Sequence, residues 1–370
     1  MRMKCWIWSL LIFTLVSAGA AHGDDAISIG AIYALTGPAT AGNAYSLEGA
    51  RLAAAELNQK GGVLGRPIQL LVFDDLSTPI GAHVAAKQAV EAGVAAIIGP
   101  PWSSHALHVA EVAQAEGIPM ITDFSTNPRI TAIGDFIFRV CFTDQFQGHA
   151  MARFAREDLG AATAVILINL TSNYSVDLAH IIQKDFEQLG GQVLARIEYK
   201  PNQPSFAPVV QQAEAADADV IFFSGHDESG LIIRASQGHP IRSIPVGGDG
   251  WSVESFFDKG GYLLSRGYYC SHWARDMASP ASHAFLAKYG KNATLDVGTA
   301  LAYDAVMLLA DAINRAGRVD RQGIRDALAT TRSFPGVTGR ISFDKQGDPL
   351  KRVVIMQIRD GKPFYLKTMD

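Results

Sequence analysis

Short runs rich in β-branched and apolar residues alternate with longer helical patterns along most of the chain, and this alternation limits the possible folds more than any other feature. Several runs are apolar throughout, which is typical of parallel strands buried on both faces. The predicted strands are Ile27–Tyr33, Ile68–Phe73, Val94–Gly99, Ile118–Thr122, Phe136–Val140, Thr163–Ile168, Gln192–Glu198, Asp219–Ser224, Ser243–Gly247 and Gly267–Ser271. The predicted helices between them are Ala44–Lys60, Ile80–Ala92, His105–Glu116, Phe146–Leu159, Val176–Leu189 and Phe206–Ala216. The region from Pro280 onward is predicted to be mostly helical, with Leu301–Ala316 and Arg321–Thr330, and to close with the strand-like segments Arg340–Phe343, Arg352–Arg359 and Phe364–Lys367. This order predicts an α/β fold with doubly wound parallel sheets and helices on both sides of each.

The length of the chain predicts two lobes. The pattern of strand and helix restarts near Thr163 after an irregular interval at Cys141–Gln147. Single hydrophobic cores stop growing at roughly 250–300 residues, and this chain of 370 residues exceeds that size. The interval at Cys141–Gln147 is therefore predicted to be a first crossing from one lobe into the other.

The first residues have the order of a secretory signal peptide. Arg2 and Lys4 precede an almost uncharged apolar run, Cys5–Ser17, and the small residues Ala18–Ala20 follow it. The apolar run is shorter than the roughly 20 residues that a membrane span needs, which argues against the alternative of an uncleaved anchor. We therefore predict a cleaved signal peptide at residues 1–23 and export of the remaining chain.

Charge and cysteine content exclude several classes of function. The chain has 32 Lys and Arg against 36 Asp and Glu, a formal net charge of −4, and it has no basic run that would indicate nucleic-acid binding. Only Cys141 and Cys270 follow the predicted signal peptide. Two cysteines make neither a disulfide framework nor a metal cluster.

Motifs of catalysis and of cofactor binding are absent from the sequence. It has no nucleophile elbow, no P-loop, no zinc-protease motif and no set of cysteines and histidines with zinc spacing. His105 and His108 lie three residues apart on a predicted helix, where a solvated face explains them better than a metal. We therefore predict no catalytic residues, no metal and no cofactor.

Polar and aromatic residues gather directly after the predicted strands. The segments are Pro100–Ser104, Asp123–Thr126, Asn169–Tyr174, Gly225–Asp227 and Gly248–Trp251. Ligands of open α/β sheets bind beyond the carboxyl ends of the strands, often against helix N-termini. These segments are therefore the candidate walls of a ligand site.

The hydroxyl residues of these segments each have a second interpretation. Ser103 or Ser104 can simply cap the following helix, or the helix N-terminus can offer N–H groups and a hydroxyl to a carboxylate. Ser125 and Thr126 can be ordinary turn residues before Pro128. The residue types alone do not decide between these interpretations.

The acidic and aromatic residues have alternatives as well. Asp249 lies between two glycines and can be a turn residue, but in a closed cleft its carboxylate needs a cationic partner. The aromatic residues at strand ends are individually more often packing residues than ligand contacts; they are Trp102, Phe124, Tyr174 and Trp251.

A set of short motifs, in this order and spacing, resembles the branched-chain amino-acid-type periplasmic substrate-binding proteins of ABC transporters. The resemblance covers nearly all of the chain after the signal peptide, from Ile27 to about Lys367. Its markers are Ile29–Ala31, Leu35–Pro38, Glu48–Ala50, Ala53–Asn58, Gly61–Gly65, Asp74-Asp75, Ile98-Gly99, Gly117–Ile121 and Ala302–Ala305. It implies the type I periplasmic binding protein fold, with two lobes joined by a three-crossing hinge.

The resemblance also implies roles for residues at the strand ends. A serine at a helix N-terminus, here Ser103, meets the ligand carboxylate. A backbone carbonyl and a threonine two residues later, here Phe124 and Thr126, hold the ammonium and the carboxylate. The far lobe contributes an aromatic residue, here Tyr174, and an acidic residue that accepts the ammonium, here Asp249.

The chain departs from the leucine/isoleucine/valine-binding members in its side-chain pocket. His226 stands where those members have a tyrosine, and Gly42 replaces the tyrosine of the first loop, with Tyr45 one helical turn on. Trp102 and Ser77 occupy the positions of a disulfide-bonded cysteine pair. Specificity for leucine therefore does not follow from the resemblance.

These observations together predict lobe 1 at residues 26–143 and 274–352, and lobe 2 at residues 144–273 and 353–370. Cys141 and Cys270 fall near two crossings, where they form either a disulfide or two buried thiols. Hinge closure is expected to trap the ligand in the cleft between the lobes. The predicted ligand-binding residues are Gly42, Trp102, Ser103, Ser104, Phe124, Thr126, Tyr174, His226, Asp249 and Trp251.

The predicted function is a periplasmic receptor that binds a small amino acid and delivers it to the membrane permease of an ABC transporter. One alternative ligand is an aromatic or aliphatic carboxylate without an amine, for which Trp102, Phe124 and Trp251 would suit a ring. A second alternative is a sensory module that reports ligand occupancy to a membrane receptor. A third, a hydrolase, has only Ser103 with His105 as a near candidate and lacks the motif.

Overall fold

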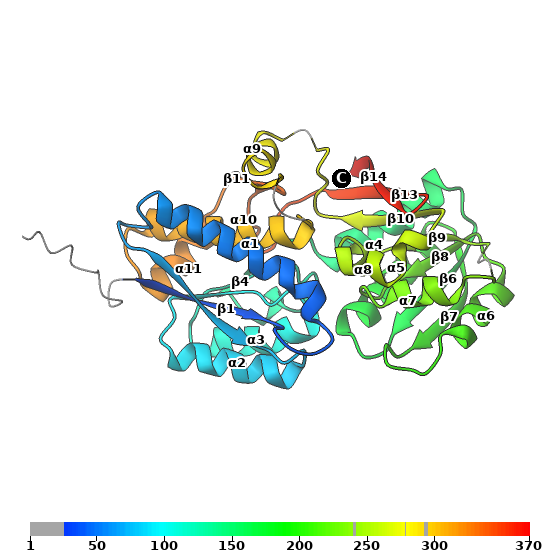
Figure 1. Ribbon diagram of the computed structural model, residues 1–370, viewed down its shortest axis with the longest axis horizontal. Coiled ribbons are helices and arrows are strands. Elements are labelled where there is room, and N and C mark those ends of the chain that lie inside the picture. The colour runs from blue at the N-terminus through cyan, green and yellow to red at the C-terminus, as the bar shows by residue number, and fades with distance from the viewer. Residues whose placement is uncertain (1–25, 240–241, 278, 292–294) are drawn as a thin grey trace, which may run out of the picture.

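The computed structural model describes residues 26–239, 242–277, 279–291 and 295–370, and its two large sheets are placed side by side (Figure 1). The predicted signal peptide at residues 1–23 lies outside the described residues. The first sheet is parallel throughout, with the strand order β2-β1-β3-β4-β5. Its strands are β1 (Ile27–Tyr33), β2 (Ile68–Asp74), β3 (Ala96–Ile98), β4 (Met120–Thr122) and β5 (Ile137–Arg139).

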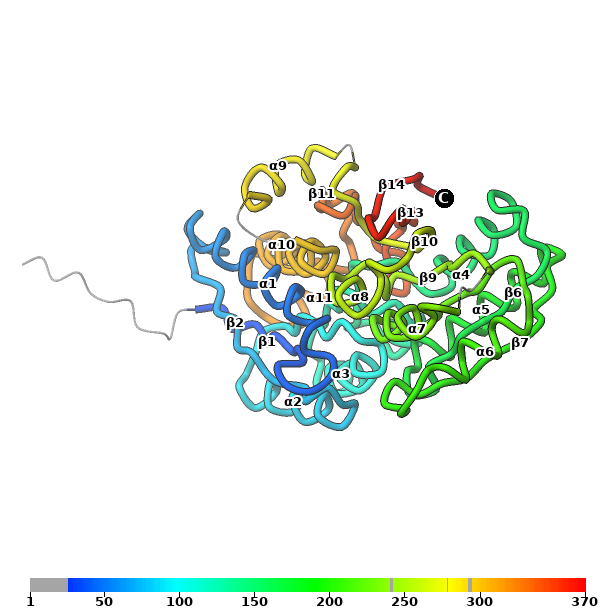
Figure 2. Tube along the Cα trace, turned by 45° about the vertical axis from the view of Figure 1, so that its right-hand side comes forward, coloured from blue at the N-terminus to red at the C-terminus, as the bar shows by residue number. Residues whose placement is uncertain are grey.

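Helices cover both faces of this first sheet. They are α1 (Thr40–Gln59), α2 (Pro79–Glu91), α3 (Ser103–Ala115), α10 (Val297–Ala316) and α11 (Arg321–Ala329). Helix α10 packs along α1, as two views of the chain show (Figures 1 and 2). It is the one helix among the described residues with the length and hydropathy of a membrane span, but 78% of that stretch is buried inside the protein. Burial against α1 and the sheet explains its apolar composition.

The second sheet has seven strands in the order β14-β13-β10-β9-β8-β6-β7. The strands are β6 (Thr163–Asn169), β7 (Gln192–Tyr199), β8 (Val220–Phe223), β9 (Ile244–Gly247), β10 (Arg266–Ser271), β13 (Val353–Arg359) and β14 (Lys362–Met369). Strands β6 to β10 are parallel, as predicted, whereas β13 and β14 are antiparallel additions. The sheet is mixed because β13 pairs antiparallel with β10, and a tight turn at Asp360 and Gly361, both with positive φ, then returns the chain as β14.

The remaining elements flank the second sheet or lie above the first. Helices α4 (Asp144–Arg153), α5 (Asn173–Gln188), α6 (Ala207–Ala216), α7 (Ser229–Ala235) and α8 (Glu254–Lys259) accompany the second sheet. Helix α9 (Pro280–Tyr289) and the short hairpin of β11 (Phe334–Gly336) and β12 (Gly339–Ile341) lie together near the top of Figure 1. The sequence did not predict β11, which is only three residues long and contains Pro335.

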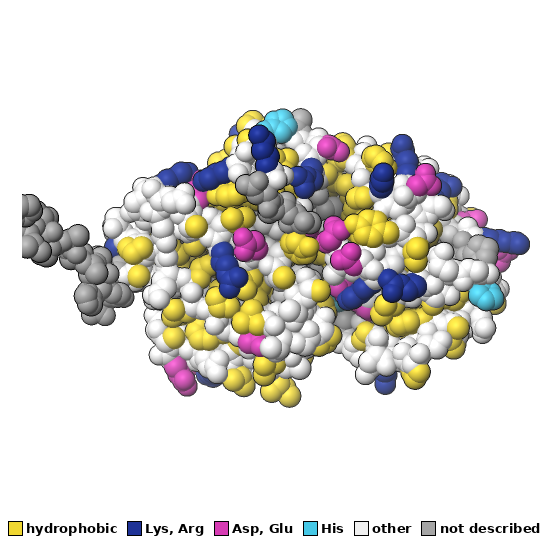
Figure 3. Space-filling view, in the orientation of Figure 1, with side chains coloured by type: hydrophobic (Ala, Val, Ile, Leu, Met, Phe, Trp, Pro, Cys, Tyr) yellow, Lys and Arg dark blue, Asp and Glu magenta, His cyan; other side chains and the backbone are white. Residues whose placement is uncertain are grey.

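The chain passes between the two sheets after β5, after β10 and before β13, which gives the predicted three-crossing hinge. The lobe boundaries themselves, residues 26–143 with 274–352 and 144–273 with 353–370, stay a prediction. On the face shown in Figure 3, Lys and Arg side chains are interspersed with Asp and Glu and form no continuous basic patch.

Both cysteines of the hinge region are buried free thiols rather than a disulfide. Cys141 follows β5 and Cys270 lies on β10. Burial raises the pKa of both thiols well above the ordinary value, so both stay protonated at neutral pH. Of the two arrangements left open by the sequence, the structure has the pair of buried thiols.

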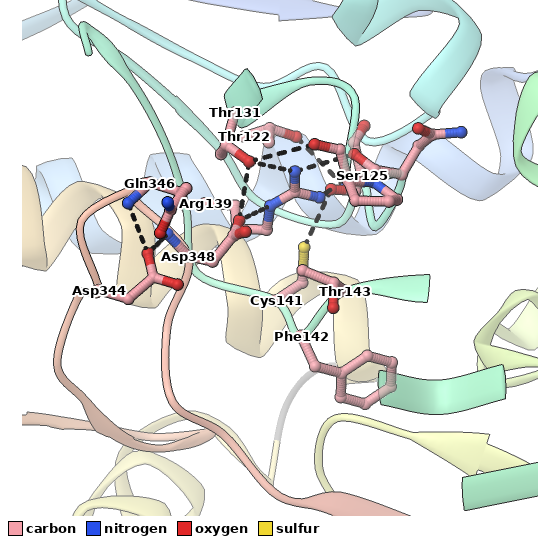
Figure 4. A network of polar contacts seen from close by, with 12 residues as sticks. Thr122, Ser125, Thr131, Arg139, Cys141, Phe142, Thr143, Asp344, Gln346 and Asp348 are labelled. Carbon is pink, nitrogen blue, oxygen red and sulfur yellow. Dashed lines mark hydrogen bonds and ion pairs between the residues drawn. The ribbon is translucent and has the colours of Figure 1, made fainter. Parts of the chain in front are cut away.

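A buried arginine on β5 organises the loops next to the first hinge crossing (Figure 4). The Arg139 side chain is fully buried, and its Nε donates to Oδ1 of Asp348 at 2.6 Å. Its Nη1 donates to the carbonyl of Ser125 at 2.7 Å, and its Nη2 donates to the carbonyl of Asn127 at 2.8 Å. Arg139 therefore fixes the loop after β4 and ties it to the segment that leads into β13.

Replacing Arg139 with methionine should destabilise the protein by about 3–5 kcal/mol, because it removes a buried charged donor from Asp348 and from the carbonyls of Ser125 and Asn127. Urea unfolding followed by circular dichroism measures the change. Arg153→Met is the control: Arg153 is half-buried and its partner Glu157 is exposed, so the loss should stay below about 1 kcal/mol. Equal losses in the two variants would contradict the role given to Arg139.

Candidate functional site

A cavity of about 410 Å³ lies between the carboxyl ends of the two sheets. Its walls come from the segments after β3, β4, β6, β8 and β9, together with the start of α1. Eight of the ten predicted ligand-binding residues line it; they are Gly42, Trp102, Ser103, Phe124, Thr126, Tyr174, His226 and Asp249.

The N-terminus of α3 supplies one wall of the cavity. Trp102 precedes the helix and makes no side-chain cap, and the Ser103 hydroxyl accepts the N–H of Asn127 at 3.3 Å. Neither Ser103 nor Ser104 caps this helix, so the capping interpretation of these serines is wrong. The first N–H groups of an α-helix lack intrahelical partners, and the helix dipole favours an anion there. This wall can receive a carboxylate.

The loop after β4 is held rigidly beside α3. The Ser125 hydroxyl donates to the carbonyl of Pro100 at 2.8 Å, and its N–H donates to Oγ1 of Thr122 at 3.3 Å. Arg139 holds the Ser125 carbonyl from the other side. Phe124 and Thr126, on either side of Ser125, therefore face the cavity from a fixed backbone.

Asp249 is the buried carboxylate of the opposite wall, and it has three side-chain donors. Its Oδ1 accepts the Tyr174 hydroxyl at 2.7 Å and Nε2 of Gln147 at 3.1 Å. Its Oδ2 lies 2.8 Å from Nε2 of His272. The phenol and the amide are neutral donors, so they satisfy hydrogen bonds without compensating the negative charge.

The glycines on either side of Asp249 permit close backbone packing. A Cβ at Gly248 would lie 2.4 Å from the Tyr174 hydroxyl, and a Cβ at Gly250 would lie 2.7 Å from the carbonyl of Gly225. Neither glycine has a positive φ. Both positions therefore require glycine, because neighbouring atoms leave no room for a Cβ. The interpretation of Asp249 as a simple turn residue is incomplete.

His272 links Asp249 to the hinge. It lies just beyond β10, at the second crossing, and its ring stacks on Phe142 of the first crossing with 3.6 Å between centroids. The backbone N–H of Phe142 points at Nδ1 of His272 at 3.4 Å, so Nδ1 is the acceptor and Nε2–H is the donor to Asp249. Burial lowers the pKa of His272, which keeps the imidazole neutral at neutral pH.

A second buried carboxylate, Asp144, lies next to Asp249. Nε2 of Gln147 donates to Oδ1 of Asp144 at 2.7 Å as well as to Asp249, and Oε1 of Gln147 accepts the N–H of Asp249. The other oxygen of Asp144 is buried without a hydrogen-bond partner. Burial, together with the charge of Asp249, raises the pKa of Asp144 to about 7.

The cavity is acidic. Its lining contains the carboxylates of Asp227 and Asp249, and none of its lining residues is lysine or arginine. Asp227 is already paired with Lys259 at 2.6 Å. The charge of Asp249 is therefore the uncompensated one in this part of the described chain, and it favours a ligand that carries a cation.

Three aromatic rings stack across the cleft. The rings of Trp102 and His226 are parallel within 4°, with 4.7 Å between their centroids. Tyr174 stacks on His226 with 4.6 Å between centroids. Burial lowers the pKa of His226, so the ring in the middle of the stack is neutral. The stack joins the segment after β3 to the segments after β6 and β8.

Two predicted ligand-binding residues lie outside the cavity. Trp251 is fully buried in the second lobe, where it stacks on Phe256 at 4.4 Å and packs against Phe223 at 4.9 Å. Its indole belongs to the hydrophobic core because the chain turns inward directly after Asp249. Ser104 instead bonds across the cleft, where its hydroxyl accepts the N–H of Asn173 at 3.0 Å.

The sequence did not single out Gln147, His272 or Asp144. All three belong to the hinge crossings or to the helix that follows the first one, and none follows a strand that ends at the cavity. The available signal was the irregular interval at Cys141–Gln147, which indicated a crossing but no binding role.

The described residues contain no cluster of three or more His, Cys, Asp or Glu side chains able to hold a metal ion. His105 is buried, so the interpretation of it as part of a solvated helix face is wrong, and its Nδ1 lies 2.8 Å from Oδ2 of Asp75. Ser103, the nucleophile of the hydrolase alternative, accepts the N–H of Asn127 and has no hydrogen bond to His105 among the described contacts.

Comparison with known proteins gives consistent matches over nearly the whole chain. The Leu/Ile/Val-binding protein BraC3 of Rhizobium johnstonii is 29% identical over 342 residues, which cover 91% of this chain and 92% of that protein. The crystal structure of the leucine binding protein LivK from Thermotoga maritima is 33% identical, covers 93% of this chain and 99% of that one, and superimposes with a TM-score of 0.87.

Two further structures carry ligands. The branched-chain amino acid transporter substrate binding protein LivJ from Streptococcus pneumoniae, in complex with isoleucine, is 28% identical with a TM-score of 0.86, covering 93% of this chain and 99% of that one. A solute binding protein of an ABC transporter from R. palustris, in complex with 4-hydroxybenzoate, has a TM-score of 0.82 and covers 94% of this chain and 97% of that one. At 22% identity, the second likeness shows the shared fold alone.

The family model described as periplasmic binding protein matches residues 26–363. Proteins of this family bind substrates for transporters and are not enzymes, and the family name implies a location outside the cytoplasm. The match, the fold and the cavity between the sheets agree, and the chain belongs to the periplasmic binding protein family, in the group of branched-chain amino-acid-type binding proteins of ABC transporters.

Proposed function

We propose that this protein is the periplasmic receptor of an ABC importer and binds a small α-amino acid in the cavity between its lobes. The observation that carries the proposal is the buried carboxylate of Asp249, whose charge is not compensated by any lysine or arginine in the cavity lining. An uncompensated buried charge is costly, and a ligand ammonium offsets that cost.

The ligand would lie with its two charged ends on opposite walls. Its carboxylate faces the N-terminus of α3 at Ser103, where helix N–H groups and the dipole favour an anion. Its ammonium faces Asp249. The Asp249 carboxylate can accept about four hydrogen bonds and accepts three from its neighbours, which leaves one position free on Oδ2. Phe124 and Thr126 complete the near wall, and Tyr174 and His226 the far one.

A ligand with a short aliphatic side chain fits this arrangement best. The rings of Trp102, Phe124, Tyr174 and His226 give the cavity an aromatic surface with few further polar groups. Relatives named for leucine, isoleucine and valine support the same class of ligand. Because Gly42 and His226 alter the side-chain pocket, the proposal is a small amino acid rather than leucine in particular.

The second candidate ligand is an aromatic carboxylate without an amine. Structures of the same fold bind 4-hydroxybenzoate and benzoate, and the aromatic walls of this cavity would suit a ring. Such a ligand carries only a negative charge, which Asp249 and Asp144 oppose. The alternative of a sensory module needs a different membrane partner but the same ligand chemistry.

Replacing Asp249 with asparagine should weaken binding of an α-amino acid at least tenfold, because the substitution removes the charge that attracts the ammonium and keeps the side-chain shape. Isothermal titration calorimetry measures the affinity. The matched ligand is the same acid without the amine, whose affinity should stay equal or rise, since the opposing charge is gone.

Gly42→Ala is the matched control for Asp249→Asn. A Cβ at Gly42 would meet Trp102 Nε1 and Ser255 Oγ at 3.9 Å, an ordinary contact distance, and it leaves the charge unchanged. Its amino-acid affinity should change less than that of the Asp249 variant. Unchanged amino-acid affinity in Asp249→Asn would reject the assignment of the ammonium site.

The affinity for an α-amino acid should also rise as the pH increases from 6 to 8. The pKa of Asp144 is about 7 in the protein, and an ammonium bound nearby favours its ionised form and lowers that pKa. Binding therefore releases a proton at pH 6, where Asp144 is protonated, and the affinity there should be about three- to tenfold weaker than at pH 8. Calorimetry in buffers of different ionisation enthalpy detects the proton.

Asp144→Asn should flatten this pH dependence while keeping an acceptor for Gln147. Asp296→Asn is the control, because burial raises the pKa of Asp296 to about 7 as well, but Asp296 does not line the cavity. The pH dependence of this control should match the wild type. A steep dependence that persists in Asp144→Asn would assign the proton to another group.

A further inference from the structure

A second cavity lies directly behind the candidate ligand site. It is open to solvent, with about 980 Å³ of space including that open part, and the segments after β6 and β8 line it. Trp102, His226 and Asp227 line both cavities. We call the first the inner cavity and the second the outer chamber. The wall between them consists of the stacked rings of Trp102 and His226.

This wall is well packed. The two rings are parallel within 4° at 4.7 Å between centroids, and Tyr174 supports His226 from its other face at 4.6 Å. Nε2 of His226 lies 3.2 Å from the Ser172 hydroxyl, which fixes the orientation of the ring. A ligand side chain that starts in the inner cavity therefore ends against His226.

The two rings come from opposite sides of the cleft. Trp102 follows β3 of the first sheet, and His226 follows β8 of the second. The wall thus exists only while the two sheets are close together, so it forms in the closed state around a ligand. A side chain too long for the inner cavity would have to separate the rings and would oppose closure.

The outer chamber has a net negative charge. Glu228 is buried, and its Oε1 accepts Nδ2 of Asn169 at 2.7 Å and the Tyr199 hydroxyl at 2.9 Å, both neutral donors. Asp227 is paired with Lys259 at 2.6 Å, which leaves the charge of Glu228 without a cation among its described contacts. The chamber is therefore suited to the positively charged end of a side chain.

We propose that the stacked Trp102–His226 pair determines the length of the ligand side chain, and that the outer chamber behind it is a subsite for the cationic end of a longer amino acid. In the native protein the pair restricts binding to side chains that fit the inner cavity. Removing the His226 ring joins the two spaces and admits long cationic side chains. The inference rests on the proposed amino-acid function and deepens it.

The experiment compares wild type with His226→Ala by calorimetry, using alanine and valine as short ligands and two matched pairs of long ones. The pairs are lysine with norleucine, and arginine with citrulline, which differ mainly in terminal charge. In the variant, the affinity for lysine and arginine relative to valine should increase at least tenfold over wild type. The gain for norleucine and citrulline should be smaller, because they do not compensate the charge of Glu228.

The double variant His226→Ala, Glu228→Gln tests the charge of the outer chamber. Glutamine keeps an acceptor for Asn169 and Tyr199 but removes the negative charge. It should abolish the advantage of lysine over norleucine and leave the affinity for norleucine unchanged. A retained advantage would show that the cation lies elsewhere and would overturn the subsite.

His108→Ala is the control for the loss of a histidine ring, since His108 lies on α3 with an exposed side chain outside both cavities. Its ligand profile should equal that of wild type. If wild type binds amino acids and His226→Ala leaves the ratio of long to short ligands unchanged, the partition is wrong and the proposed function stands. If neither protein binds any amino acid, both the proposed function and this inference fail.

Discussion

The carboxylate of Asp249 lies where the second sheet, the hinge and the cavity meet, and the surrounding structure satisfies its hydrogen bonds without neutralising it. Tyr174 and Gln147 donate to one oxygen and His272 to the other. All three donors are neutral, since burial lowers the pKa of His272. An Arg or Lys in their place would compensate the charge permanently and would remove the reason to bind a cation. The ligand chemistry of the site depends on this choice of donors.

The same carboxylate connects ligand binding to the hinge. His272 holds Asp249 from the second crossing and stacks on Phe142 of the first. Gln147, just after the first crossing, holds Asp249 and Asp144 together. The donors of Asp249 all lie in the same predicted lobe as Asp249, and the contact of His272 with Phe142 is what links them to the first crossing. Arg139 performs the corresponding task on the near wall, where it fixes the loop of Phe124 and Thr126 to the segment before the third crossing.

The sequence predicted most strands, and eight of the ten predicted ligand-binding residues line the cavity, because both follow local rules. Buried parallel strands are apolar runs, and ligands lie at their carboxyl ends. Trp251 was misplaced because the rule gives the position of a residue along a strand end and not the direction of its side chain. Ser104 faces the opposite lobe, a contact that depends on the closed arrangement of both sheets. Gln147 and His272 were missed because their roles arise from the convergence of crossings distant in sequence.

The uncompensated charge of Asp249 also affects which ligands would favour closure of the two lobes. Asp249 and Asp144 are buried and share the single amide of Gln147, so their negative charge is costly unless a cation lies beside it. Closure around a ligand without a cation retains that cost in full, whereas closure around an ammonium offsets it. A ligand shifts a conformational equilibrium only by its difference in affinity for the two states. Under the proposed function, an ammonium beside this carboxylate pair would therefore favour closure more than a ligand without a cation.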